Sequence, residues 1–187
     1  MESPVIDPEE PDIALLARFR RGDQSAFAAL VLRYQKAIFN AAFRVVGNAP
    51  DAADVTQEVF LKIVERLDDY DHKYKFFSWI YRIAVNESID VLRRARREEP
   101  LEDDEDSQPP DLLGPDGRYQ SRQVGDRVQQ ALLRMTLDHR IVLTMRHFSE
   151  MSYQEISAVL AIDEKTVKSR LFEARQVMAL HLADFRP

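Results

Sequence analysis

The chain has 187 residues, of which 45% are hydrophobic and 31% are charged, and its formal net charge at pH 7 is -6. This length allows one medium-sized domain or two small ones, and the absence of cysteine excludes disulfides and thiolate metal sites. The acidic first residues do not resemble a signal peptide, and no apolar run approaches the roughly 18 residues of a membrane span. We therefore expect a cytoplasmic protein with no membrane span.

The acidic residues are concentrated in two segments. Residues 2–12 contain five acids and residues 98–111 contain eight, and neither segment has a lysine or an arginine. Removing these 13 acids from a net charge of -6 leaves +7 on the rest of the chain. The parts that can fold are therefore basic, as expected for a protein with an anionic partner.

The N-terminal part is predicted to form four helices. Their expected ranges are Ile13–Arg20, Ser25–Val46, Asp51–Leu67 and Phe76–Arg97, with a polar loop at residues 68–75. In the third helix Val55, Val59, Ile63 and Leu67 recur every four residues, which is the spacing of one buried face. Gly47 follows the second helix, as is typical of a helix C-terminus.

Residues 98–120 are predicted to be a linker, because four prolines and two glycines accompany the acids there. The fold class is expected to be all-α, with two small helical domains joined by this flexible acidic segment. The expected division is an acidic tail at 1–12, a domain at 13–97, the linker at 98–120 and a domain at 121–187. The second domain should begin with helices at Ser121–Met135 and Asp138–Phe148.

The end of the chain has the pattern of a helix-turn-helix. Ser152 and Glu155 form a capping box that starts one helix, and Asp163 can cap the next. On the second helix an apolar face is opposed by polar, basic and aromatic residues. The apolar face is Val167, Leu171, Ala174 and Met178, and the opposite face is Lys165, Lys168, Ser169, Phe172 and Gln176, with Arg175 on its flank. This layout suits a helix that enters a DNA major groove, although a plain helical hairpin with a solvated face is the alternative.

A second candidate nucleic-acid surface lies at residues 72–97. This stretch has seven Lys or Arg against two acids, together with Tyr74, Phe76, Phe77, Trp79 and Tyr81. Aromatic rings can stack on unpaired bases while cations follow the phosphates. The alternative is that the rings belong to the core and the arginines only favour the helix dipole.

Four stretches carry a resemblance to the extracytoplasmic-function group of bacterial sigma-70 family sigma factors. They are residues 22–27 (GDQSAF), 51–60 (DAADVTQEVF), 77–86 (FSWIYRIAVN), and 151–156 (MSYQEI) with 166–175 (TVKSRLFEAR). Their order matches the second and fourth regions of that family, with the third region absent. The resemblance implies a protein that binds core RNA polymerase, directs it to promoter DNA and helps to open the duplex. It implies no enzyme activity, no cofactor and no metal in this chain.

The resemblance also implies three groups of site residues. Core polymerase binding is expected at Asp54, Gln57, Glu58, Phe60 and Lys62. Binding of the unpaired minus-10 element is expected at Asp71, His72, Lys73, Lys75, Trp79, Tyr81, Arg82 and Asn86. Binding of the minus-35 duplex is expected at Tyr153, Lys165, Thr166, Lys168, Ser169, Phe172 and Arg175.

The chain departs from the family pattern at two of these surfaces. Ala53 replaces a common acid on the polymerase-binding helix, and Glu173 replaces a common cation on the minus-35 helix. An anti-sigma factor is an expected partner. The acidic linker is either a solvated tether or a nucleic-acid mimic that enters the polymerase channels.

Two other functions are compatible with parts of the sequence. A stand-alone helix-turn-helix regulator would need a dimerisation helix, and each predicted helix already belongs to a domain. A metal-dependent hydrolase could use Asp103, Asp104 and Asp106, but the four histidines lack paired ligand spacing.

Overall fold

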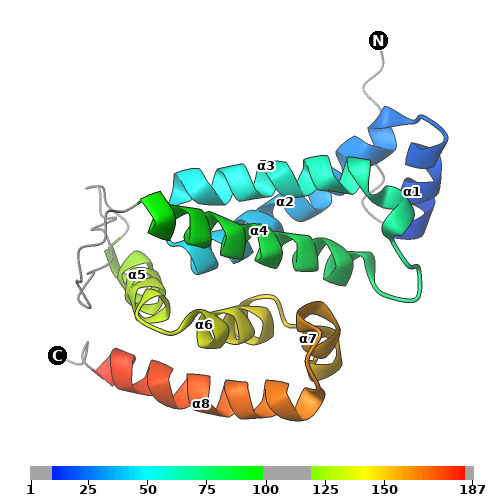
Figure 1. Ribbon diagram of the computed structural model, residues 1–187. Helices are drawn as coiled ribbons and strands as arrows, with labels where there is room; N and C mark the ends of the chain where they lie inside the picture. The colour runs from blue at the N-terminus through cyan, green and yellow to red at the C-terminus, as the bar shows by residue number, and fades with distance from the viewer. Residues whose placement is uncertain (1–9, 99–118, 184–187) are drawn as a thin grey trace.

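The computed structural model describes residues 10–98 and 119–183, and these residues form helices and short connections (Figure 1). The N-terminal group comprises α1 (Asp12–Arg20), α2 (Gln24–Val46), α3 (Ala49–Glu65), the 3-10 turn η1 (Leu67–Asp69) and α4 (Phe76–Glu98). The C-terminal group comprises α5 (Tyr119–Leu133), α6 (Leu137–Leu143), the π-helical segment η2 (Thr144–Phe148), α7 (Tyr153–Leu160) and α8 (Glu164–Ala183). The expected all-α fold with two helical regions is confirmed, and most of the linker expected at 98–120 lies outside the described residues.

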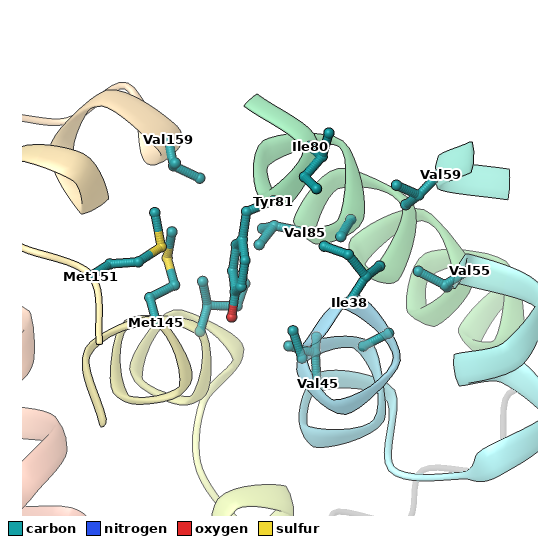
Figure 2. Close-up of a cluster of buried hydrophobic side chains, with 14 of the residues drawn as sticks. Ile38, Val45, Val55, Val59, Ile80, Tyr81, Val85, Met145, Met151 and Val159 are labelled. Carbon is teal, nitrogen blue, oxygen red and sulfur yellow. The ribbon is translucent and has the colours of Figure 1, made fainter. Parts of the chain in front are cut away.

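Helices α2, α3 and α4 pack against one another around one core (Figure 2). The four-residue period of α3 is confirmed, because Val55, Val59 and Ile63 are all buried. Val55 and Val59 lie in the same core as Ile38 of α2 and Ile80 of α4. Burying an aliphatic side chain of this size contributes about 1.5–3 kcal/mol. Packing of this stripe therefore fixes which face of α3 remains outside.

The boundaries of α3 differ from the expected ones for identifiable reasons. The Asn48 side chain accepts a hydrogen bond from the Asp51 amide at 2.9 Å, so the helix begins at Ala49, two residues early. It ends at Glu65, and Leu67 is buried from the 3-10 turn that follows. The glycine after α2 is confirmed as its terminator, since Gly47 has a left-handed φ of 95°.

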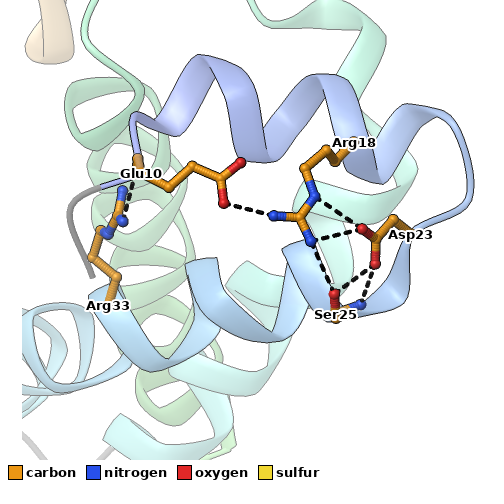
Figure 3. A network of polar contacts seen from close by, with 5 residues as sticks. All are labelled: Glu10, Arg18, Asp23, Ser25 and Arg33. Carbon is orange, nitrogen blue, oxygen red and sulfur yellow. Dashed lines mark hydrogen bonds and ion pairs between the residues drawn. The ribbon is translucent and has the colours of Figure 1, made fainter. Parts of the chain in front are cut away.

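Helix α1 is held to α2 by a network of ion pairs (Figure 3). Arg18 lies 2.6 Å from Glu10 and donates from Nε to Asp23 at 2.9 Å, and Asp23 also accepts from the Ser25 hydroxyl. The hydrogen bonds from Ser25 and Arg18 lower the pKa of Asp23 to about 2. Arg33 of α2 binds the Glu10 carbonyl oxygen at 2.7 Å. These contacts order the chain from Glu10 onward against the helical core.

The C-terminal group has the expected helix-turn-helix and one irregular helix. Both halves of the Ser152–Glu155 capping box are present, and the Asp163 carboxylate accepts from the Thr166 amide at 2.7 Å. Val167, Leu171 and Ala174 are fully buried, and Met178 is half-buried. The continuous helix expected at Asp138–Phe148 is wrong in detail, because its second half is the π-helical segment. Such segments often occur where function or packing distorts a helix.

Candidate polymerase and nucleic-acid interfaces

The expected polymerase-binding residues lie on two different sides of α3. Gln57 and Phe60 line an apolar groove between α2 and α3 with a volume of about 670 Å³. Asp54, Glu58 and Lys62 line a separate polar groove between α3 and α4, of about 830 Å³. The structure therefore does not bring the five residues into one patch, because one set faces α2 and the other faces α4.

Lys62 is largely engaged within the fold. Its ammonium lies 2.5 Å from the Glu87 carboxylate of α4 and 3.7 Å from that of Glu58. Glu87 is buried, so this pair holds α3 against α4. Lys62 is therefore less available to a partner than the sequence pattern suggested.

The apolar groove contains residues that the sequence analysis missed. Val31 and Phe39 of α2 line it, together with Leu61 of α3, which is 53% exposed. The signal was present in the sequence, because Leu61 falls outside the four-residue stripe that points into the core. Leu61 and the apolar residues around it therefore make this groove a candidate site for a protein partner.

The loop before α4 carries an aromatic cluster. The Tyr70 ring lies 4.9 Å from that of His72, 5.4 Å from that of Phe76 and 5.4 Å from that of Trp79. The Tyr70 hydroxyl donates to the Tyr74 carbonyl at 2.7 Å, which closes the loop. The expected minus-10 residues of the loop itself are exposed: Asp71, His72, Lys73 and Lys75.

Arg20 of α1 supports this loop and was missed from the sequence. Its Nη2 donates to the Leu67 carbonyl at 2.9 Å, and its Nη1 lies 3.2 Å from Nε2 of His72. Its Nε lies 3.7 Å from the Asp68 carboxylate. Leu67 and His72 follow Arg20 by 47 and 52 positions, and no sequence pattern links residues so far apart. Only the folded structure reveals these contacts.

Only some of the expected minus-10 residues on α4 are exposed to solvent. Arg82 and Asn86 are exposed one turn apart, and Trp79 is half-buried. Tyr81 is 1% exposed, so its expected availability to DNA does not hold in this arrangement of the two helical groups. The reason is that Tyr81 points into the contact with the C-terminal group, where burial raises its pKa to about 12.

Helix α8 leaves its expected reading face open. Lys165, Lys168, Ser169, Phe172 and Arg175 are all exposed, and the Phe172 ring is 61% exposed. Thr166 is half-buried, and its hydroxyl donates to Asp163 at 3.0 Å, so it belongs to the helix cap. The Tyr153 ring of α7 lies 5.1 Å from the Arg146 guanidinium and 5.9 Å from the Lys168 ammonium.

Glu173, which opposes phosphate on this face, has nearby partners. The Ser169 hydroxyl donates to its carboxylate at 3.1 Å, and Nε2 of His139 lies 3.5 Å away. Arg175 donates from Nε to Nε2 of His147 at 3.4 Å. Burial and the neighbouring Arg175 and Arg146 lower the pKa of His147, which keeps its ring neutral and able to accept.

The described residues offer no support for the metal-dependent alternative. Within residues 10–98 and 119–183, no three His, Asp or Glu side chains are grouped so as to hold a metal ion. The acids that this alternative invoked, Asp103, Asp104 and Asp106, lie outside the described residues. No helix in the described part of the chain is long and apolar enough to cross a membrane.

Comparison with known proteins assigns both helical groups to one family. The family model of Sigma-70 region 2 matches residues 30–98, and that of Sigma-70, region 4 matches residues 125–178. The RNA polymerase sigma-H factor of Pseudomonas aeruginosa is 34% identical over 179 residues, covering 91% of this chain and 93% of the relative. The ECF RNA polymerase sigma factor SigW of Bacillus subtilis is 29% identical over 178 residues, covering 90% and 95%.

Solved structures agree with this assignment. The structure of CnrH in complex with the cytosolic domain of CnrY matches with a TM-score of 0.71 at 26% identity, over 94% of this chain and 99% of that one. The sigma factor RpoE of Bartonella quintana, in complex with the anti-sigma factor NepR, shares the fold with a TM-score of 0.70 at 22% identity, over 86% and 98%. The chain therefore belongs to the extracytoplasmic-function (ECF) group of the sigma-70 family of RNA polymerase sigma factors.

Proposed function

We propose that this ECF sigma factor uses three surfaces to direct transcription initiation, one for core polymerase and two for promoter DNA. The α2–α3 groove binds core polymerase, the α4 face with the preceding loop captures the unpaired minus-10 element, and α8 reads the minus-35 duplex. The observation that carries the proposal is the two-sided character of α8. On one side of α8, Val167, Leu171 and Ala174 are fully buried. On the opposite side, Phe172 is exposed among lysine and arginine side chains.

The α8 surface has the chemistry of a major-groove reader. Lysine and arginine can reach phosphates or guanine edges, serine can bond any base edge, and phenylalanine can contact a thymine methyl. The exposed Phe172 ring can supply apolar contact area at a nucleic-acid interface. Ser169 and His139 contact the carboxylate of Glu173, the acid on this face, whose side chain is 57% exposed.

The α2–α3 groove suits a protein partner better than DNA. It is lined by Val31, Phe39, Phe60 and Leu61, and Lys36 is the cation among its lining residues. Protein interfaces have an apolar, aromatic centre and a polar rim, as this groove does. We assign core polymerase to it, with Gln57 and Lys36 on the rim.

The α4 surface supports capture of an opened strand. The half-buried Trp79 and the exposed His72 offer ring faces, and Arg82, Lys73 and Lys75 offer charge. Stacking on such rings is worth about 1–3 kcal/mol per base. Binding the unpaired strand lowers the free energy of the open state, so no chemical catalysis by this chain is needed.

The polymerase performs the nucleotidyl transfer. The sigma factor acts in the cytoplasm, together with the polymerase. An anti-sigma factor regulates the sigma factor.

The function is tested by run-off transcription with purified core polymerase on a genomic promoter library, followed by mapping of start sites. The chain should direct initiation at a shared set of promoters. Absence of promoter-dependent transcripts with competent core enzyme would refute the proposal, and the stand-alone regulator would then be the better assignment.

Two matched variants on α3 test the groove. Leu61→Asp places a charge in it, whereas Val64→Asp changes a residue of similar exposure, 48% against 53%, outside the residues that line it. We expect Leu61→Asp to weaken core binding at least tenfold, measured by fluorescence anisotropy, and Val64→Asp to leave it within about twofold. Equal losses in both variants would place the polymerase elsewhere.

A further inference from the structure

The reading face of α8 carries an acidic side chain, Glu173, beside the residues proposed to contact DNA. At about 100° per residue, Ser169 lies between Phe172 and Glu173 on the helix surface, about 60° from the first and about 40° from the second. The Glu173 side chain is 57% exposed, and Phe172 is 61% exposed. A groove that receives Ser169 and Phe172 therefore receives the Glu173 carboxylate as well.

Two side chains hold this carboxylate, one from its own helix and one from α6. The Ser169 hydroxyl donates to Oε1 of Glu173 at 3.1 Å, and Nε2 of His139 lies 3.5 Å from Oε2. Helix α6 packs along α8 (Figure 1), and Asp138 lies 3.0 Å from the Arg170 guanidinium of α8. The carboxylate is thus oriented before DNA binds, so less rotamer freedom is lost on binding.

The surroundings of the His139 ring determine which nitrogen donates to the carboxylate. The side chain is 17% exposed, and Nδ1 is buried without a hydrogen-bond partner among the described residues. A proton on Nδ1 would bury an unsatisfied donor, whereas a proton on Nε2 is directed at Glu173. The His139 ring therefore positions the carboxylate from the protein side and leaves its outer side open.

The carboxylate retains acceptor capacity for a base. A carboxylate has about four lone-pair sites on its two oxygens, and the contacts with Ser169 and His139 use one site each. About two sites remain, and an ionised carboxylate can only accept hydrogen bonds. The group that completes this site in a major groove is therefore a hydrogen-bond donor.

Cytosine is the base that offers such a donor without a competing acceptor. In the major groove the cytosine edge presents the N4 amino group, whereas adenine presents its N6 amino group beside the N7 acceptor. Guanine presents two acceptors, and thymine presents an acceptor and a methyl group, so neither can donate to a carboxylate. Phosphates repel the carboxylate, which favours a contact with a base edge over one with the DNA backbone.

We propose that Glu173 is a specificity-determining residue of the minus-35 reader, which selects cytosine at one position through the N4 amino group, with His139 and Ser169 as positioning residues. The inference rests on the proposed function, because it requires α8 in the major groove. The exposed Lys165 and Lys168 supply phosphate affinity that does not depend on sequence. Because a cation is common in the family at position 173 and cannot accept a hydrogen bond, this contact belongs to this chain in particular.

A binding selection tests the proposal with holoenzyme reconstituted from the full chain and purified core polymerase. The DNA is a promoter mapped by run-off transcription and randomised across its minus-35 element. The wild type should enrich cytosine at one position by about tenfold over the other bases. Glu173→Ala should abolish the preference at that position and leave the preferences elsewhere within about twofold. Glu173→Gln should shift the preference toward adenine, because a carboxamide can pair with both N6 and N7.

Glu164→Gln is the matched control for charge. Glu164 is exposed in the first turn of α8, about 140° around the helix from Ser169. Both glutamine variants remove one negative charge from the same helix, so a general gain in phosphate affinity appears in both. Only Glu173→Gln should change the base preference. Circular dichroism and thermal melting verify that each variant is folded.

The positioning role of His139 is measured by the same selection. His139→Ala should lower the cytosine preference by about threefold, because the carboxylate loses one of its two donors. His139→Gln retains a donor and should restore part of the preference. A purely structural role of His139 would change the melting temperature without changing the base preference.

A modified base tests the contact itself. N4-methylcytosine still pairs with guanine, but a methyl group replaces the amino hydrogen that faces the major groove. At the selected position this base should weaken binding of wild-type holoenzyme by about tenfold. The Glu173→Ala holoenzyme should bind the methylated and unmethylated promoters equally.

Three outcomes would count against the proposal. An unchanged cytosine preference in Glu173→Ala would overturn it and leave α8 as the minus-35 reader. A uniform gain in affinity for all sequences would show that Glu173 only repels phosphate, which also overturns the inference. A wild-type holoenzyme that transcribes but enriches no minus-35 sequence would instead refute the proposed role of α8, and the inference with it.

Discussion

Arg140 and Val45 are 95 residues apart in the sequence, yet the guanidinium of one donates to the carbonyl of the other at 2.6 Å. The same guanidinium donates to the carbonyls of Leu132, Leu133 and Met135 at 3.0, 2.8 and 3.2 Å. Burial lowers the pKa of Arg140 to about 10, which still leaves it charged at neutral pH. One buried cation therefore closes the α5–α6 turn and fastens it to α2.

Replacement of Arg140 by methionine should destabilise the protein by about 3 kcal/mol, because several buried carbonyls lose their donor. Arg140→Lys should recover little of the lost stability, since a lysine ammonium cannot place donors at all the carbonyls that the planar arginine guanidinium reaches. Urea unfolding followed by circular dichroism measures both variants. A lysine variant as stable as the wild type would show that charge alone, and not the fork, holds the turn.

Arg20→Met should impair strand opening without unfolding the protein. Arg20 binds the Leu67 carbonyl and lies beside His72, so its loss frees the loop that precedes α4. We expect about a tenfold loss of permanganate reactivity at unpaired thymines in open complexes, with duplex binding unchanged. Arg21→Met is the control, because Arg21 is exposed on the same helix end. Equal effects of the two variants would point to general charge loss.

Phe172→Ala should weaken binding of minus-35 duplex by about tenfold at constant stability, because the ring is exposed and contributes little to the core. Lys165→Ala should reduce the salt dependence of binding by about one unit of slope if the ammonium contacts a phosphate. Leu180→Ala is the control, since Leu180 is 69% exposed on the same helix beyond the reading face. Titrations at several salt concentrations measure all three, and an unchanged affinity for Phe172→Ala would remove that ring from the reading surface.

Alkaline pH should weaken the contact of Tyr81 with the C-terminal group. Burial raises the pKa of Tyr81 to about 12, only partly opposed by the Ser149 hydrogen bond and the nearby Arg44 charge. The folded state therefore favours the neutral phenol. The stabilisation of the folded state by this phenol is complete below the ordinary tyrosine pKa of about 10 and is lost as the pH rises toward 12. Two pKa units correspond to at most about 3 kcal/mol.

Tyr81→Phe isolates this contribution. The variant cannot ionise, so its unfolding free energy should fall less between pH 10 and 12 than that of the wild type, although at pH 7 it lacks the Ser149 bond. Urea unfolding across this range, with both proteins in the same buffers, makes the comparison. Parallel pH curves for the two proteins would show that Tyr81 is not buried from solvent in the free chain.

The amino-acid sequence by itself determined the helices and their inward faces. The period of Val55, Val59 and Ile63, the Ser152–Glu155 capping box and the stop at Gly47 are local features, encoded within one or two turns. Such features depend on backbone hydrogen bonds and side-chain spacing that neighbouring residues set. The ordered motifs likewise sufficed to identify the family.

Only the tertiary structure decided which residues remain accessible. The expected polymerase-binding residues line two different grooves, and Lys62 pairs with Glu87. Leu61 joins the apolar groove, and Arg20 supports the loop before α4. Tyr81 is buried against the C-terminal group. Each outcome depends on contacts between residues 20 or more positions apart, whose free energy comes from packing and desolvation. A periodic pattern specifies which face of a helix is apolar, but the partner that covers that face is fixed only when the helices assemble.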